Sequence, residues 1–521
     1  MPTVNQLPGP DARRAALQVV GVMVFALAVR AWLAPRYFGW EEGDYGNLMM
    51  IREVIDSQFT WFRTAHMPGW YTLGALARLL AGDAARIPAL WMTMLFSVAG
   101  VGVATAIARS IAGESAGWLA GLWLAVQPEM TLYGASTLRS PVYTTLGLLG
   151  LWLILRGRRA GFIATAAAFL VRMEAFFVFF GPALLTWGPG RGRRWRALLP
   201  GLLVLGSVVV SWQGYIVLAQ GETAPFWAGP LGQNQAGGIS VEFVQGGLGS
   251  VWHLLTWTLP RKLSWFCLAL AGVGAVTAIG GFGRPGARPV ALYACTTLGF
   301  WLAEGFLSQQ DPNHNLYWVW LLPAIPPLVL LAAVGWASIA ERLAGLPRLG
   351  RSALLGVVLL SAVPAFVSEG RYQMERSEQW YRPQLELARW LETNARPGAG
   401  MVLGSIPEVW VQRKDHAFRV TSWWFLPPSL KGQPATALGS FLASQQIDYV
   451  MWFAEEWTEA PAIAPFLAEG VEVDLGPARL VPVAREDGYG WILYVVERPG
   501  APPPPRPPPF GAGHRGAGWG P

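Results

Sequence analysis

Charged side chains are scarce in this sequence. Only 14% of its 521 residues are Asp, Glu, Lys or Arg, whereas 53% are hydrophobic. A composition this apolar excludes an ordinary soluble globule and is typical of a protein that crosses a membrane several times. The formal net charge of +7 comes mainly from Arg in short loops. The chain therefore has no basic domain of the kind that binds nucleic acid.

Cysteine is nearly absent, and so is a cleavage signal after the first apolar segment. Both cysteines, Cys267 and Cys295, fall inside apolar runs, where a disulfide is unusual, so they do not indicate a redox compartment. The first apolar segment, 15–34, lacks an Ala-x-Ala cleavage site and is long enough to span a bilayer. We therefore expect it to be a retained first helix.

Apolar windows recur along the chain and predict its membrane topology. They fall at 15–34, 87–108, 116–128, 141–155, 160–187, 197–219, 263–282, 289–307, 316–340 and 352–368. The window 160–187 is long for one crossing and contains Arg172 and Glu174, which are costly at mid-bilayer. If it is a hairpin with this pair at its outer tip, the arginine-rich loops all face the cytoplasm, as the positive-inside rule requires. The sequence thus predicts about eleven transmembrane helices.

Composition divides the chain into three parts. Residues 1–369 hold the predicted spans and an outer loop, 35–86, with an acidic motif. Residues 370–498 begin with an amphipathic helix, 379–394, and predict a small extracytoplasmic α/β domain. Its β-like runs fall at 401–406, 447–453 and 490–497. The Pro- and Gly-rich residues 499–521 predict a disordered tail.

Three carboxylates lie just outside the first span. They are Glu41, Glu42 and Asp44, and His66-Met67-Pro68 follows in the same loop. Clustered carboxylates raise one another's proton affinity, so one of them can serve as a general base near neutral pH. The alternative is that these acids cap a helix that begins near Gly43, a role for which Asp44 is best placed.

The acidic motif and five later elements resemble one superfamily. Glu41-Glu42-Gly43-Asp44-Tyr45 after the first span, then His66-Met67-Pro68 before an aromatic helix, resemble the GT-C glycosyltransferases that use polyprenyl-phosphate sugars. The resemblance is strongest to the protein-mannosyltransferase-like and aminoarabinose-transferase-like branch. Further elements agree in order: Ser136-Thr137-Leu138-Arg139-Ser140-Pro141, Leu170-Val171-Arg172-Met173-Glu174-Ala175, His314-Asn315-Leu316-Tyr317-Trp318 and Ala388-Arg389-Trp390-Leu391-Glu392-Thr393-Asn394.

The chain departs from the superfamily pattern at two places. It has Glu41-Glu42 where the family usually has Asp-Glu, which leaves open whether Glu41, Glu42 or Asp44 takes the catalytic position. It also has Arg139-Ser140-Pro141 where many relatives have an acid.

The resemblance implies a glycosyltransferase of the cell envelope. Such an enzyme lies in the plasma (inner) membrane and works on its extracytoplasmic side. It transfers a sugar from a polyprenyl-phosphate donor to a hydroxyl of a glycan, lipid or protein, with inversion by single displacement. This chemistry needs one carboxylate base and cations for the departing phosphate. The substrate-binding residues expected on this basis are His66, Arg139, Arg172, Glu174, His314 and Tyr317.

No cofactor is expected. A divalent metal is not favoured, because the later outer loops contain no second acid-x-acid element. Simpler roles remain for four candidates. Arg172 and Glu174 can be a structural pair, and His314 can be part of a solvated turn. Arg139 can equally anchor the chain at the lipid headgroups.

Two other functions are compatible with a polytopic chain. The first is a transporter or flippase for lipid-linked glycans, which uses Arg172 and Glu174 as a charge relay. Inverted repeats or broken helices would favour it, and the sequence shows neither. The second is a non-catalytic binding subunit that has kept the fold.

Overall fold

The computed structural model describes residues 10–34, 48, 50–51, 54–55, 57–58, 60, 67–81, 86–186, 194–220, 241–280, 286–308, 321–343, 345, 347–394, 399–403, 418–422, 435–453, 470–486 and 491–506. They belong to two compact units: the second holds Leu48 and the residues from Glu375 onward, and the first holds the others. The boundary between Met374 and Glu375 lies inside one long helix. Composition had predicted a boundary at 369–370. The first unit is helical, and the second contains a β-sheet.

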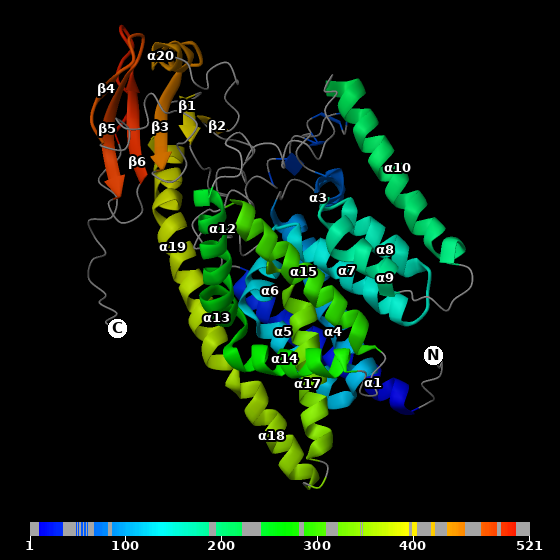
Figure 1. Ribbon diagram of the computed structural model, residues 1–521. Coiled ribbons are helices and arrows are strands. Elements are labelled where there is room, and N and C mark those ends of the chain that lie inside the picture. Colours follow the sequence, from blue (N-terminus) through cyan, green and yellow to red (C-terminus); the bar gives the residue numbers. More distant parts are fainter. Residues whose placement is uncertain are drawn as a thin grey trace. The chain divides into compact units, whose positions relative to one another are not determined.

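The helical unit is shown in Figure 1. Its elements are α1 (Pro10–Leu33), α3 (Pro68–Ala81), α4 (Arg86–Ala112), α5 (Glu114–Val126), α6 (Pro128–Leu132), η1 (Tyr133–Ala135), α7 (Ser140–Leu155), α8 (Ala160–Phe169), η2 (Phe176–Phe180), α9 (Gly181–Thr186), α10 (Arg194–Gln220), α12 (Val241–His253), η3 (Leu254–Thr258), α13 (Leu259–Leu263), α14 (Trp265–Ile279), α15 (Ala287–Ser308), α17 (Ile325–Arg342), α18 (Arg348–Ser361) and α19 (Val363–Asn394), which continues into the second unit.

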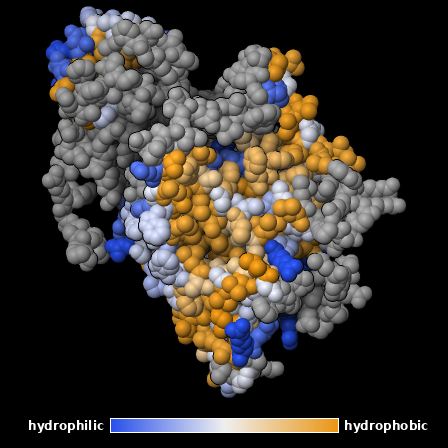
Figure 2. Space-filling view, in the orientation of Figure 1, coloured by the Kyte–Doolittle hydropathy of each residue, from blue (hydrophilic) through white to orange (hydrophobic). Residues whose placement is uncertain are grey.

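The apolar outer surface identifies the helical unit as membrane-embedded. In the described residues, six helices are long and apolar enough to cross a bilayer, or eight if two bent helix pairs each count as one span. These helices turn large apolar side chains outward, for example Leu218 at 88% and Val276 at 67% exposed. Figure 2 shows the resulting apolar surface on one face. Such a surface is stable only against lipid. The count of eleven spans stays a prediction, because α5 and α8 are apolar but shorter.

Residues 160–186 form the hairpin that the sequence predicted. α8 ends at Phe169, turns follow, and η2 and α9 run back beside α8 (Figure 1). The ring of Phe162 in α8 lies 6.3 Å from that of Phe180 in η2. Because this contact joins residues on either side of the turn, the segment 170–174 is the tip of the hairpin.

Two helices of the unit are broken, which sequence analysis had missed. The pair 128–135 and 140–155 bends by 119°, and the pair 244–263 and 265–279 bends by 103°. The second bend occurs at Ser264, whose φ of 64° is uncommon for a residue other than Gly. Ser264 stabilises the new helix, because its hydroxyl accepts a hydrogen bond from the Cys267 amide at 3.2 Å. These breaks place polar backbone and charged side chains inside the helical unit.

The second unit is organised by a six-stranded mixed sheet. Its elements are β1 (Ala399–Leu403), β2 (Phe418–Ser422), α20 (Ala435–Ser444), β3 (Ile447–Phe453), β4 (Val473–Asp474), β5 (Arg479–Glu486) and β6 (Trp491–Glu497). The strand order is β2-β1-β3-β6-β5-β4, with β1 parallel to both neighbours and the other pairs antiparallel. α20 covers one face, where Leu442 packs among alternating strand residues such as Val450 and Tyr494.

The predicted β-like runs correspond to strands of this sheet. The runs at 447–453 and 490–497 fall on β3 and β6, and the run at 401–406 overlaps β1. The predicted helix at 379–394 is the second half of α19. Beyond β6, the Tyr449 hydroxyl donates a 2.9 Å hydrogen bond to the Pro505 carbonyl, and residues 507–521 of the predicted tail lie outside the described residues.

Candidate active site

The hairpin tip holds a buried ion pair. Arg172 donates from Nη2 to Oε1 of Glu174 at 2.9 Å and from Nε to Oε2 at 3.3 Å. The two side chains are only 5% and 15% exposed. Arg172 Nη1 also donates to the Ser140 hydroxyl at 3.2 Å, and the guanidinium lies 5.3 Å from the centre of the Tyr143 ring. The tip is therefore fastened to the first turn of α7.

The geometry of this pair keeps both groups charged. Burial by itself raises the pKa of the Glu174 carboxyl, but the adjacent Arg172 guanidinium more than offsets this, and Arg139 contributes in the same direction. The net result is a pKa of Glu174 below its usual range. The tip thus presents an ionised Glu174 held by Arg172.

Three of the sequence motifs meet at this tip. Arg139, from the 136–141 element, donates from Nη1 to the hydroxyl of Tyr71 in α3 at 3.2 Å. The amide of Gly69, at the start of α3, donates to the carbonyl of Leu170 in the hairpin at 2.8 Å. A Cβ at Gly69 would lie 2.6 Å from that carbonyl oxygen, so only glycine allows this approach. The segment that follows His66-Met67-Pro68 is therefore docked against the tip.

Sequence analysis missed one acid near this cluster. Glu304 lies on α15, half-buried, and interacts electrostatically with Glu174 and Arg172. No motif marked it, because it is a single acid within an apolar helix. The only available signal was its position inside a predicted span, where an ionisable residue is costly.

The remaining predicted site residues lie outside the described residues. These are Glu41, Glu42, Asp44, His66, His314 and Tyr317. Their roles stay predictions. Of the predicted set, the structure describes Arg139, Arg172 and Glu174, and it places all three in one cluster.

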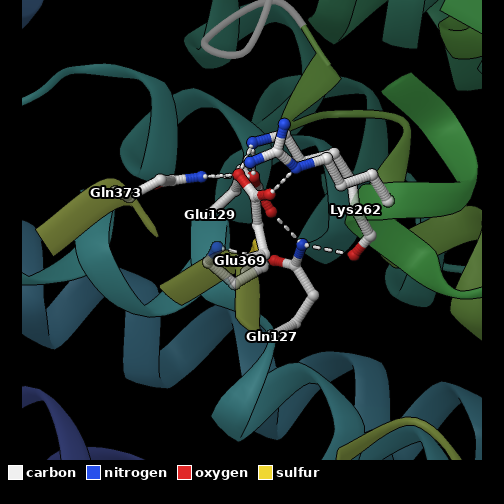
Figure 3. Close-up of polar contacts among 7 residues, drawn as sticks. Gln127, Glu129, Lys262, Glu369 and Gln373 are labelled. Carbon is white, nitrogen blue, oxygen red and sulfur yellow. Dashed lines mark hydrogen bonds and ion pairs between the residues drawn. The ribbon is translucent and has the colours of Figure 1, made fainter. Parts of the chain in front are cut away.

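A second charged cluster connects the two broken helices, and sequence analysis did not single out any of its members. Lys262 of α13 pairs with Glu129 of α6 at 2.7 Å and also with Glu369 of α19. Gln373 donates to Oε1 of both Glu129 and Glu369 at 2.8 Å, and Gln127 donates to Glu129. Figure 3 shows the five side chains converging from α6, α13 and α19 and from Gln127, which precedes α6. Lys262 and both carboxylates are at most 1% exposed.

Arg261 completes the charge balance of this network. Its Nε lies 2.5 Å from Oε2 of Glu369, and its guanidinium lies 4.8 Å from the centre of the Trp257 ring and 4.1 Å from that of Tyr372. Lys262 and Arg261 thus neutralise Glu129 and Glu369. A buried network whose members are all paired can hold helices together, because each charge is compensated inside the protein.

The described residues form no evident metal centre. Within the part of the chain that the structure covers, no group of three or more His, Cys, Asp or Glu side chains is arranged to hold a metal ion. The acidic motif 41–44 falls outside that part, so the expectation of metal independence stays a prediction.

Comparison with known proteins identifies the fold. No protein-family model and no curated protein sequence matches the chain. It is similar to the crystal structure of ArnT from Cupriavidus metallidurans bound to undecaprenyl phosphate. That match has 16% identity and a TM-score of 0.62, and it covers 92% of this chain and 97% of ArnT. An oligosaccharyltransferase from Archaeoglobus fulgidus, in its apo form, matches with 12% identity and a TM-score of 0.50 over 84% of this chain and 70% of that one. Both are GT-C glycosyltransferases, so the chain has the GT-C fold.

Proposed function

We propose that this protein is a membrane glycosyltransferase that transfers a sugar from a polyprenyl-phosphate donor to an acceptor hydroxyl. The observation that supports it most directly is the charged cluster at the hairpin tip, where Arg139 and Arg172 converge beside the start of α3. The shared fold supports the proposal, since ArnT, which has that fold, was crystallised with undecaprenyl phosphate. The proposal does not specify the sugar, the acceptor or the length of the lipid.

The two arginines suit the leaving group of this reaction. As the bond between the anomeric carbon and the phosphate oxygen breaks, negative charge grows on that oxygen. A guanidinium fixed beforehand stabilises this charge without reorganising, and its remaining N–H groups can donate to phosphate oxygens. Ser140, Tyr143 and Glu174 hold Arg172 in place from three sides, so its position is set before substrate arrives.

The acceptor needs a base, for which we propose Glu41 or Glu42. Removal of the hydroxyl proton by a carboxylate lets the acceptor oxygen attack the anomeric carbon from the face opposite the phosphate. A single displacement of this kind inverts the configuration. Asp44, which directly precedes Tyr45, is assigned to the helix-capping role.

We propose that the protein lies in the plasma membrane, with the hairpin tip and the sheet unit on the extracytoplasmic side. Arginine loops then face inward. In a variant with Cys267 and Cys295 replaced by Ser, a new cysteine at Arg158 or Arg342 should be shielded from an impermeant thiol reagent added to intact cells. A cysteine at Ser440 or Glu472 should label. All four sites are exposed, so permeabilised cells should label at every position.

The opposite pattern would reverse the orientation, with the hairpin tip in the cytoplasm. Labelling at Arg158 and Glu472 from the same side would instead contradict the assignment of loops to sides.

Replacing Arg172 or Arg139 with Gln tests the phosphate-binding cluster. Each change should lower the chemical rate of transfer by about 10²–10³-fold, as does loss of one preorganised donor to a developing charge. Arg172→Lys should restore only part of the rate, because an ammonium lacks the bidentate fork. The measurement is single-turnover transfer by reconstituted protein from a polyprenyl-phosphate sugar.

A matched control is Arg30→Gln. Arg30 is also buried, but its donors go to Ser97 Oγ and to the carbonyls of Ala26, Ala125 and Met130, so it is a structural residue. Arg30→Gln should lower the melting temperature. The fraction of this variant that folds should transfer sugar at the wild-type rate. If Arg172→Gln behaves in the same way as this control, Arg172 is structural as well.

The two broken helices favour transport as a second candidate, since transporters bind substrate at such breaks. In this chain, however, the charges beside the breaks pair with one another. An assay with sealed vesicles separates the two functions. The membrane of the vesicles contains a lipid-linked sugar, and the acceptor is added outside. A transferase attaches the sugar to the acceptor, whereas a transporter moves the lipid-linked sugar between leaflets without changing it.

A further inference from the structure

α15 packs along the returning arm of the hairpin. The Tyr293 ring lies 6.3 Å from that of Phe179, and the Thr296 hydroxyl donates to the Val178 carbonyl at 3.5 Å. The helical period places Glu304 on the same stripe of α15 as Tyr293 and Thr297, both of which are buried. Glu304 thus belongs to the side of α15 that faces the hairpin.

The two segments run in opposite directions. Glu304 lies about two helical turns beyond Thr296 along α15, while the hairpin leads from Val178 back to its tip at Glu174 and Arg172. The carboxylate therefore approaches the level of the tip, which agrees with its electrostatic interaction with Glu174 and Arg172. Packing and electrostatics lead to the same location.

Glu304 changes the charge of the cluster. Within the described part of the chain, the tip contains the cations Arg139 and Arg172 and the anions Glu174 and Glu304. Glu174 is held by Arg172 through two hydrogen bonds. When Glu304 is ionised, the two cations are balanced, and the cluster attracts a phosphate through directed donors more than through net charge.

We propose that Glu304 is a specificity-determining residue that makes the site select a singly charged lipid phosphodiester over more highly charged lipid phosphates. This inference rests on the proposed function. A polyprenyl-phosphate sugar is a phosphodiester with one negative charge. The polyprenyl phosphate left after transfer is a monoester, whose charge at pH 7 is about −1.5 to −2. A lipid diphosphate carries more.

The charge of Glu304 repels these ligands in proportion to their own charge. Repulsion between like charges in a partly buried site, where the effective dielectric constant is about 20, is on the order of tenfold in affinity for each negative charge on the ligand. The site therefore excludes diphosphate-linked lipids and also weakens its hold on the spent monoester. Glu304 thereby favours release of the lipid product and entry of the next donor.

Binding of three lipids to purified protein tests the proposal. The probes are the methyl phosphodiester of undecaprenyl phosphate, undecaprenyl phosphate and undecaprenyl diphosphate, measured in one detergent at pH 7.5. Glu304→Gln should tighten the binding of all three lipids, that of the diester least and that of the diphosphate most. The preference for the diester over the diphosphate should therefore fall by about tenfold or more. Glu304→Asp should keep the wild-type order of affinities. Glu341→Gln removes an exposed acid from the end of α17 and should change nothing.

The outcomes separate this inference from the proposed function. If the wild type binds all three lipids and Glu304→Gln leaves their relative affinities unchanged, Glu304 does not set specificity, and the proposed function stands. If the wild type binds none of them, the proposed function fails. Should Glu304→Gln fold poorly, Glu304→Met removes the same charge at similar volume and must shift the affinities in the same order. An equal loss of affinity for all three lipids would indicate that Glu304 has a structural role.

Discussion

Replacing one member of the acidic pair, Glu41→Gln or Glu42→Gln, is expected to lower the rate of sugar transfer by about 10²–10⁴-fold. That is the range expected for loss of a general base. The amide keeps the shape of the side chain and removes its basicity. Because the base acts on the acceptor hydroxyl, donor binding and the melting temperature should change little. The measurement is transfer from a polyprenyl-phosphate sugar beside a melting curve for each variant.

Asp44→Asn is the matched control for this prediction. If Asp44 caps a helix, the variant should lose about 1 kcal/mol of stability and retain transfer activity. Should both Glu41→Gln and Glu42→Gln transfer sugar at the wild-type rate, the base lies elsewhere. Full activity in those two variants together with an inactive Asp44→Asn would move the base to Asp44.

Lys262→Met is expected to cause the largest loss of stability, about 3–5 kcal/mol. That is the cost of leaving a buried charge without its partner. Lys262 lies between Glu129 and Glu369 and is 1% exposed, so its removal leaves two carboxylates facing each other. Methionine fills similar space, so the loss reports charge more than packing. The measurement is the melting curve and denaturant unfolding of the protein in detergent.

A double variant isolates the electrostatic part of this effect. Lys262→Met with Glu129→Gln removes one charge of each sign and leaves Glu369 paired with Arg261 at 2.5 Å. It should therefore be more stable than Lys262→Met alone, because replacing a buried pair by neutral groups costs less than breaking it. Equal stability of the single and double variants would show that the cost comes from packing.

The broad architecture could be predicted from local sequence. Hydropathy over a window of residues reports whether a segment can lie in lipid, so most helices fall where the apolar windows are. The hairpin at 160–187 followed from arginine loops on either side of it. Alternating apolar residues marked β3 and β6. In each case the signal is a property of neighbouring residues.

The breaks in the helices were not predictable in the same way. The 119° bend lies at 136–139, between the predicted windows 116–128 and 141–155, and the 103° bend lies at Ser264, next to the start of the window 263–282. Hydropathy reports only whether each segment is apolar and carries no information about the angle between two consecutive segments. Packing of other helices around the breaks maintains them.

The sequence by itself predicted a polytopic membrane protein with an α/β part, and it named Arg139, Arg172 and Glu174 among the candidate site residues. Only the tertiary structure decided that Glu304 joins this site and that Glu129, Lys262 and Glu369 form one network. The pair of Gln373 and Glu129 is separated by 244 positions in the chain. Within any hydropathy window along the sequence, each of these charged residues is a single polar position in an apolar run. The fold alone brings its partner within hydrogen-bonding distance, and a charge can remain in the interior of a membrane protein only when that partner is present.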